Sequence, residues 1–103
     1  MIIVYSCNRV PIRLTNERWE HIRQRHPEME TQRDRILETV EFPDSIQAGD
    51  FGGVLAIRHY AQTPLTSKYL VVAYREQSPD DGFILTAYFT SKPSDKRKQL
   101  WKR

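Results

Sequence analysis

Apolar positions recur with a helical period in the first part of the chain. In residues 16–40 they return every three to four positions, as on one side of an amphipathic helix. The pattern predicts a helix over Asn16–Arg25, with Thr15 as its N-cap. Pro27 ends this helix, because the residue before a proline resists helical backbone angles. A second helix is expected over Glu30–Val40.

The remaining segments are rich in strand-forming residues and are separated by turn signals. No helical pattern lies between the later strands, so an antiparallel sheet is expected rather than a parallel βαβ arrangement. We therefore expect an α+β fold, with N-terminal helices on one face of a roughly four-stranded antiparallel sheet. The basic C-terminal end could form a short helix through Trp101. The expected strands cover residues 2–7, 10–14, 45–48, 54–60, 68–75 and 83–90.

Composition narrows the class of protein. A chain of 103 residues with 39% hydrophobic and 28% charged residues is typical of one globular domain, residues 1–103. No apolar run is long enough to span a membrane and no secretory signal is evident, so a cytoplasmic location is expected. Cys7 is the only cysteine, so it forms no internal disulfide and is expected in the core. Walker-type loops, GxGxxG motifs and CxxC pairs are absent.

Positive charge is concentrated at the C-terminal end. The chain has a formal net charge of +3, and residues 92–103 alone hold six Lys and Arg against one Asp, so their excess is larger than that of the whole chain. A basic segment of this kind suits a polyanion or an acidic protein partner. The alternative interpretation is a solvated basic tail without a partner.

The first predicted helix carries a dense group of candidate chemical residues. At about 100° per residue, Trp19, Ile22 and His26 share one side of the helix, and His21 and Arg25 form a second stripe. His26 therefore lies at the helix end, where the apolar stripe meets the rim. It could act in acid–base chemistry, or it could only interact with the helix dipole. His21 and His26 are about 140° apart around the helix, so no metal site is expected.

Alternation along the later strands places a second group of polar residues on one sheet face. If the bulky Leu55 and Ile57 pack on the helices, Arg58 points to the opposite face, where it could meet Thr86 and Tyr88. An arginine, two hydroxyls and a helix-borne histidine suit phosphodiester chemistry. The alternative is an ordinary solvated sheet face. The apolar face of the last strand is expected to consist of Phe83, Leu85, Ala87 and Phe89.

Taken in order, these motifs resemble the phage-associated branch of the barnase–EndoU–colicin–RelE nuclease superfamily. The resemblance spans about residues 12–101 and implies a barnase- or RelE-like fold. It also implies a metal-independent endoribonuclease that uses the RNA 2′-hydroxyl and leaves a 2′,3′-cyclic phosphate. Several members are toxins held inactive by a cognate antitoxin protein. The matching strings are Leu14-Thr15, Glu17-Arg18-Trp19, His21-Ile22, Arg25-His26-Pro27-Glu28-Met29, Arg58 and Phe83-Ile84-Leu85-Thr86-Ala87-Tyr88.

The resemblance also implies roles for individual residues. His26 or His21 would be the general acid/base, Arg58 would clamp the phosphate, and Thr86 and Tyr88 would donate to it. No metal, cofactor or membrane is expected, and RNA and an antitoxin are the expected partners. The residues expected to bind RNA are Arg25, Lys68, Lys96, Arg97 and Lys98.

Two other functions remain open from the sequence. The chain could be a non-catalytic domain that binds RNA or a protein partner and keeps the same fold and basic end. A small regulator acting on DNA is less favoured, because no helix-turn-helix pattern is evident.

Overall fold

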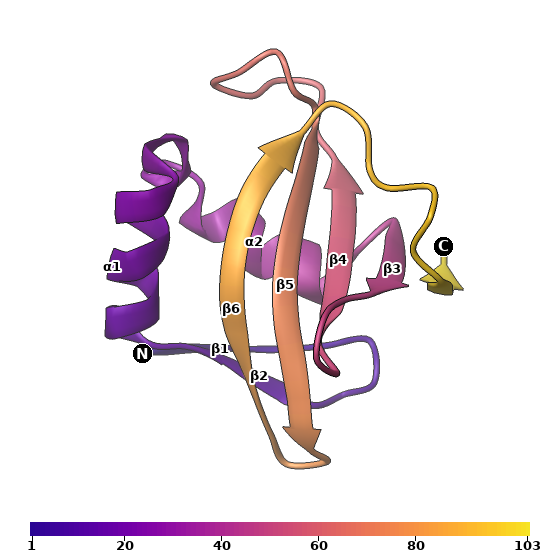
Figure 1. Ribbon diagram of the computed structural model, residues 1–103. Coiled ribbons are helices and arrows are strands. Elements are labelled where there is room, and N and C mark those ends of the chain that lie inside the picture. Colours follow the sequence, from indigo (N-terminus) through magenta and orange to yellow (C-terminus); the bar gives the residue numbers. More distant parts are fainter.

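The computed structural model describes residues 1–103 as two α-helices, one short 3₁₀ helix and a seven-stranded sheet (Figure 1). The expected α+β class is confirmed. The helices are α1 (Asn16–Arg25), η1 (Pro27–Met29) and α2 (Arg33–Glu41). The strands are β1 (Ile2–Tyr5), β2 (Pro11–Leu14), β3 (Ser45–Ala48), β4 (Val54–His59), β5 (Tyr69–Ser78), β6 (Asp81–Thr90) and β7 (Gln99–Lys102).

Helix α1 has the predicted limits because both of its ends are capped. The Thr15 hydroxyl accepts a hydrogen bond from the backbone N–H of Arg18 at 3.1 Å. At the other end the His26 N–H donates to the Ile22 carbonyl at 2.8 Å, and Pro27 then begins η1. Helix α2 begins at Arg33, three residues later than expected, because Glu30 and Thr31 form the turn that follows η1 and Gln32 is the N-cap of α2.

The sheet is larger than predicted and is mixed. Its strand order is β1-β2-β6-β5-β4-β3-β7, in which β2 and β6 are parallel and every other neighbouring pair is antiparallel. The prediction of four antiparallel strands is therefore wrong in number and in one pairing. The expected C-terminal helix is also wrong, because that segment forms β7 beside β3 (Figure 1). The parallel β2–β6 pairing and the β3–β7 pairing join segments far apart in the sequence, for which local pattern carries no signal.

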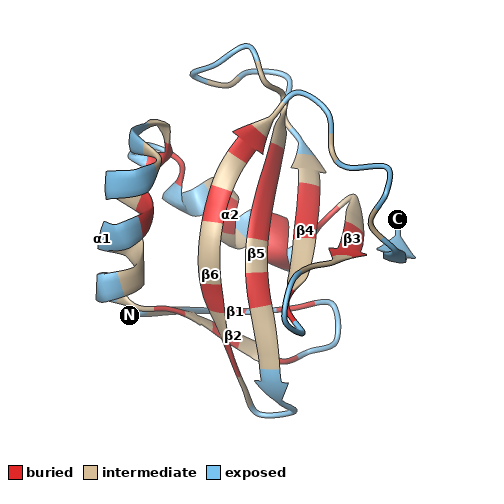
Figure 2. Ribbon diagram, viewed as in Figure 1, coloured by how far each residue is buried: buried red, intermediate tan, exposed pale blue.

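The helices pack on one face of the sheet and enclose the core. Helix α2 lies behind β4 and β5, and the buried part of α1 faces the sheet while its exposed part faces outward (Figure 2). On β5 the alternate residues Leu70, Val72 and Tyr74 point into this core. The helices contribute Ile22, Met29, Ile36 and Val40.

The assignment of faces in β4 is opposite to the prediction. Ala56 pairs with Val72 on the helix-covered face and is fully buried, so Arg58, two residues on, shares that face. Leu55 and Ile57 lie on the other face. Ile57 is nevertheless only 3% exposed, because the C-terminal segment that holds Pro93 and Arg97 covers it. Both faces of β4 are covered there, so side-chain bulk does not indicate which face meets the helices.

A bulge in β6 changes its alternation partway along the strand. Ala73 pairs with Thr86 but its neighbour Tyr74 pairs with Ile84, which leaves Leu85 as an extra residue. The prediction is therefore correct after the bulge, where Ala87 and Phe89 are buried in the core. It is wrong before the bulge, where Ile84 is in the core and Phe83 is on the opposite face.

Cys7 is not a core residue. It lies in the exposed turn that connects β1 and β2. Desolvation and the nearby Glu76 carboxylate raise the pKa of its thiol.

No helix in the structure is long and apolar enough to cross a membrane.

Candidate active site

The sheet face turned away from α2, here called the front face, faces the viewer in Figure 1 and carries most of the candidate chemistry. On this face Thr86, Tyr88 and Thr90 lie along β6, and the apolar residues Ile57, Val71 and Ala73 fill the centre. Across β4, β5 and β6 the register defines four rows on this face, which are His59–Tyr69–Thr90, Ile57–Val71–Tyr88, Leu55–Ala73–Thr86 and, at the lower end, Arg75–Phe83.

His26 and Tyr88 meet at the edge of the front face. Helix α1 stands beside β6, and its C-cap residue His26 reaches the ring of Tyr88, with 6.0 Å between the ring centroids. The Nδ1 atom of His26 is 3.6 Å from Oε1 of Glu28, and the imidazole side chain is 34% exposed. Thr86 lies two residues before Tyr88 on the same face, at a distance of about 7 Å along the strand. Two of the predicted catalytic residues, His26 and Tyr88, therefore meet here, and a third, Thr86, lies on the same sheet face.

His21 is not part of this group. It is exposed on the outer side of α1 and borders a shallow hollow formed by residues of the same helix. Arg25 is also exposed, in the last turn of α1. The other residues around the hollow are Asn16, Glu17, Glu20 and Gln24.

Arg58 does not share a face with Thr86 and Tyr88, which corrects the sequence-based prediction. Its Nη1 donates to the Phe42 carbonyl at the end of α2 at 2.6 Å, and its Nε lies 3.6 Å from Oε1 of Glu38. It pairs in register with Leu70, on the helix-covered face. Arg58 therefore connects β4 to the C-terminal end of α2, where a cation interacts favourably with the helix dipole.

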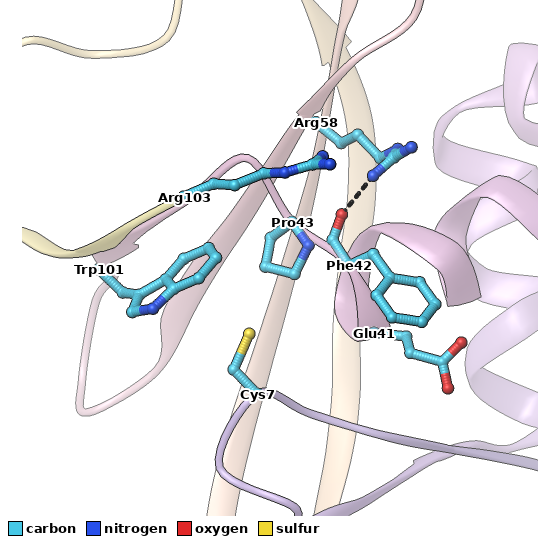
Figure 3. Close-up of a pocket in the computed structure, with 7 residues that line it drawn as sticks. All are labelled: Cys7, Glu41, Phe42, Pro43, Arg58, Trp101 and Arg103. Carbon is cyan, nitrogen blue, oxygen red and sulfur yellow. Dashed lines mark hydrogen bonds between the residues drawn. The ribbon is translucent and has the colours of Figure 1, made fainter.

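The pocket next to Arg58 is shown in Figure 3 and has a volume of about 350 Å³. Arg58 and Arg103 line it from one side, and the indole of Trp101 and the sulfur of Cys7 lie across from them (Figure 3). Each arginine already faces a carboxylate, because Arg103 Nη1 lies 3.6 Å from Oδ1 of Asp44 and Arg58 faces Glu38. The pocket therefore contains no uncompensated cation for an anionic ligand.

Tyr60 completes the cluster around Arg58. Its hydroxyl donates to Oε1 of Glu38 at 2.6 Å, and its ring contacts the guanidinium groups of Arg35 and Arg58 at 4.5 and 5.6 Å. Burial, followed by the hydrogen bond to Glu38, raises the pKa of Tyr60 to about 12. This cluster holds β4 against α2 and has no connection to the His26–Tyr88 pair.

Arg75 is a candidate site residue that the sequence analysis missed. It lies on the front face next to Phe83 and lines a hollow of about 390 Å³ together with Thr86. Its guanidinium forms no ion pair, and its Nε has no hydrogen-bond partner, while Nη2 donates to the Phe51 carbonyl. Strict alternation along β5 was the available signal, because it places residues 69, 71, 73 and 75 on one face.

The other predicted RNA-binding residues, three near the C-terminus and Lys68 before β5, differ in their environment. Arg97 is ion-paired with Asp50 at 3.2 Å and donates to the Ala48 carbonyl at 3.2 Å, so it anchors the C-terminal segment to the β3–β4 hairpin. Lys96 and Lys98 are exposed and form no ion pair. Lys68 is half-buried immediately before β5.

Comparison of the chain with protein-family models, curated proteins and solved structures gives no match. No group of three or more His, Cys, Asp or Glu side chains is placed to hold a metal ion. The function is therefore inferred from the side chains of the front face.

Proposed function

We propose that this protein is a metal-independent endoribonuclease whose catalytic groups lie on the front face. The observation that carries the proposal is the 6.0 Å separation of the His26 and Tyr88 rings, with Thr86 on the same face. A partly exposed imidazole next to Tyr88, with the Thr86 hydroxyl on the same face, provides a proton acceptor and hydrogen-bond donors for a phosphate. The resemblance of the sequence to the barnase–EndoU–colicin–RelE nucleases supports the same reaction.

The proposed reaction uses the substrate's own nucleophile. His26 accepts the proton of the RNA 2′-hydroxyl, and the 2′-oxygen forms a bond to phosphorus while the bond to the 5′-oxygen breaks. The products are a 2′,3′-cyclic phosphate and a 5′-hydroxyl, whose proton comes from solvent at this partly exposed site. Tyr88 and Thr86 donate hydrogen bonds to the non-bridging phosphate oxygens, where negative charge increases in the transition state.

Arg75 replaces Arg58 as the proposed phosphate clamp. It lies on the same face as Thr86, and no carboxylate neutralises it. A guanidinium without a carboxylate partner can bind a phosphate through two parallel hydrogen bonds. Arg58 is instead engaged with Glu38 and the Phe42 carbonyl on the other side of the sheet.

The proposal is tested by incubating the purified protein with total RNA in the presence and absence of EDTA. We expect cleavage that EDTA does not prevent, and His26→Gln should reduce it by about 10²- to 10⁴-fold, as is typical when a general base is lost. His21→Gln and His59→Gln are matched controls, because neither side chain reaches Tyr88. Equal loss in His21→Gln would contradict the assignment of His26.

A pair of arginine variants tests the position of the site. Arg75→Gln should abolish most of the cleavage, and Arg58→Gln should leave it close to the wild-type level once folding is confirmed by circular dichroism. The opposite result would place the site around the pocket in Figure 3 and refute the front-face site.

The second candidate function is a non-catalytic module that binds RNA or an acidic protein such as an antitoxin. The exposed Lys96 and Lys98 favour it, because they lie in a basic segment without carboxylate partners. In that case the folded protein would bind RNA or the acidic partner without cleaving RNA, and His26→Gln would leave the affinity unchanged.

A further inference from the structure

The tip of the β3–β4 hairpin carries an aromatic residue that neither its backbone nor its packing explains. Residues 50–53 form a tight turn, in which the Gly53 N–H donates to the Asp50 carbonyl at 2.9 Å. Phe51 and Gly52 both have positive φ angles, of 52° and 81°, which is the pattern of a type I′ turn. Such positions favour Asn, Asp and Gly. Phe51 is 94% exposed, so burial does not offset its unfavourable backbone conformation.

The backbone of this turn is fixed from several directions. Gly49 donates to the Gly53 carbonyl at 2.9 Å, and Asp50 is ion-paired with Arg97 of the C-terminal segment at 3.2 Å. From β5, the Arg75 guanidinium donates to the Phe51 carbonyl. Because the backbone is already held in place, little conformational freedom remains to be lost when the exposed ring contacts a ligand.

The turn borders the hollow that Arg75 and Thr86 line. Its volume of about 390 Å³ lies in the range of about 300–1,000 Å³ that is usual for small-ligand sites. Arg75 is its one basic lining residue without an ion-pair partner. Apolar walls and one cation without an ion-pair partner suit a flat ring that carries an anionic group, and the only carboxylate in the lining, that of Asp50, is already ion-paired with Arg97. The apolar lining residues are Phe51, Val54, Leu55, Ala73, Phe83 and Leu85.

We propose that this hollow binds one nucleotide of single-stranded RNA, with its base stacked on Phe51 and its phosphate on Arg75. The inference rests on the proposed function, because Thr86 belongs both to the hollow and to the proposed catalytic group. The bound nucleotide is therefore next to the one whose 2′-hydroxyl reacts. Contact with the face of the base, rather than its edges, makes binding depend on an aromatic base being present more than on which base it is.

The test measures binding separately from cleavage. A short, fluorescently labelled 2′-O-methyl oligoribonucleotide lacks the attacking hydroxyl, so its affinity can be measured by anisotropy without cleavage. Phe51→Asn should fold at least as stably as the wild type, because Asn suits the left-handed backbone, but should bind about 5- to 100-fold more weakly. Phe51→Trp is the matched control and should keep the wild-type affinity, because it keeps a stacking surface.

An oligonucleotide with one abasic position extends the test. It should bind the wild type more weakly than the intact strand does, and Phe51→Asn should cause little further loss if the missing base is the one that stacks. Unchanged affinity of Phe51→Asn for the intact strand would overturn the proposal, whether or not the protein cleaves RNA. Affinity that depends on Phe51 in a protein without nuclease activity would support the subsite and refute the proposed enzymatic function. No binding by the wild type would also overturn the subsite and would leave Phe51 as an anchor for a protein partner.

Discussion

At the scale of single residues, the environment of a side chain determines which of its chemical properties it can use. Tyr60 and Tyr88 illustrate this, because both are tyrosines close to a basic side chain. The hydroxyl of Tyr60 donates a hydrogen bond to Glu38 at 2.6 Å, and its ring contacts the guanidinium groups of two arginines. Tyr88 has no comparable hydrogen bond and meets His26 on the front face. Sequence alternation could pair Tyr88 with Thr86, but it could not show that His26 would reach them from a separate helix.

Tyr60 should ionise at unusually high pH. We expect the ultraviolet difference between wild type and Tyr60→Phe to show a titration near pH 12 rather than near 10, because burial and the Glu38 carboxylate disfavour the phenolate. Because its pKa is raised on folding, neutral Tyr60 also contributes to the stability of the folded state. This contribution is complete below the pKa of an unfolded tyrosine, about 10, and is lost as the pH rises towards 12. A titration of Tyr60 at its ordinary pKa would mean that the side chain is neither buried nor in contact with Glu38 in solution.

At the scale of elements, the pairing of β2 with β6 is the part of the fold that is hardest to predict from the sequence. It is the only parallel pairing, and it brings residue 12 beside residue 82. Gly82 makes this approach possible, since a Cβ atom there would lie 2.5 Å from Cδ1 of Ile12 and 2.6 Å from the Arg75 carbonyl oxygen. Arg13 adds two hydrogen bonds to Asp81 at 2.8 and 3.0 Å, and these hold the pKa of Asp81 below its usual value.

Gly82→Ala should therefore destabilise the protein by about 1–3 kcal/mol, the usual cost of overpacking a rigid site. The measurement is the midpoint of urea unfolding, with an unchanged m-value showing that the same transition is followed. Gly52→Asn is the matched control, because the nearest atom to a Cβ there is 3.9 Å away and Asn tolerates the positive φ. If Gly82→Ala unfolded at the same urea concentration as the wild type, the parallel pairing could not be as close as described.

At the scale of the whole molecule, charge and catalytic geometry are located in different places. The net charge of +3 comes from the C-terminal end, whereas the proposed catalytic group is carried by α1 and β6. Within the basic end, Arg97 and Arg103 are ion-paired with Asp50 and Asp44. The lysines are therefore the charges left free to attract the proposed RNA substrate over a distance.

Replacing Lys96, Lys98 and Lys102 together with Gln should weaken RNA binding without abolishing catalysis at saturating RNA. Each lost contact to a single strand lowers the slope of log affinity against log salt concentration by about 0.7, so the triple variant should lose a slope of about 2. Titrations at several salt concentrations measure this. An unchanged slope would show that the basic end does not contact RNA and would leave it as a binding surface for an acidic protein.

Several features of this protein were determined by the sequence alone. Thr15 and Pro27 fix the limits of α1 through a local cap and a local steric restriction, so that helix could be predicted residue by residue. Alternation after the bulge placed Thr86 and Tyr88 on one face and Ala87 and Phe89 in the core, because side chains of a strand alternate by geometry. Such features depend on interactions within a few residues.

Only the tertiary structure decided which surfaces these elements share. Leu55 and Arg58 could not be assigned to faces from the sequence, because the C-terminal segment covers the face opposite the helices and makes both sides of β4 apolar. The β6 bulge, the β2–β6 pairing and the addition of β7 to β3 depend on contacts between distant segments. For the same reason Arg75, and not Arg58, faces the hollow beside Thr86, since the face that a strand residue occupies is fixed by what packs against the sheet.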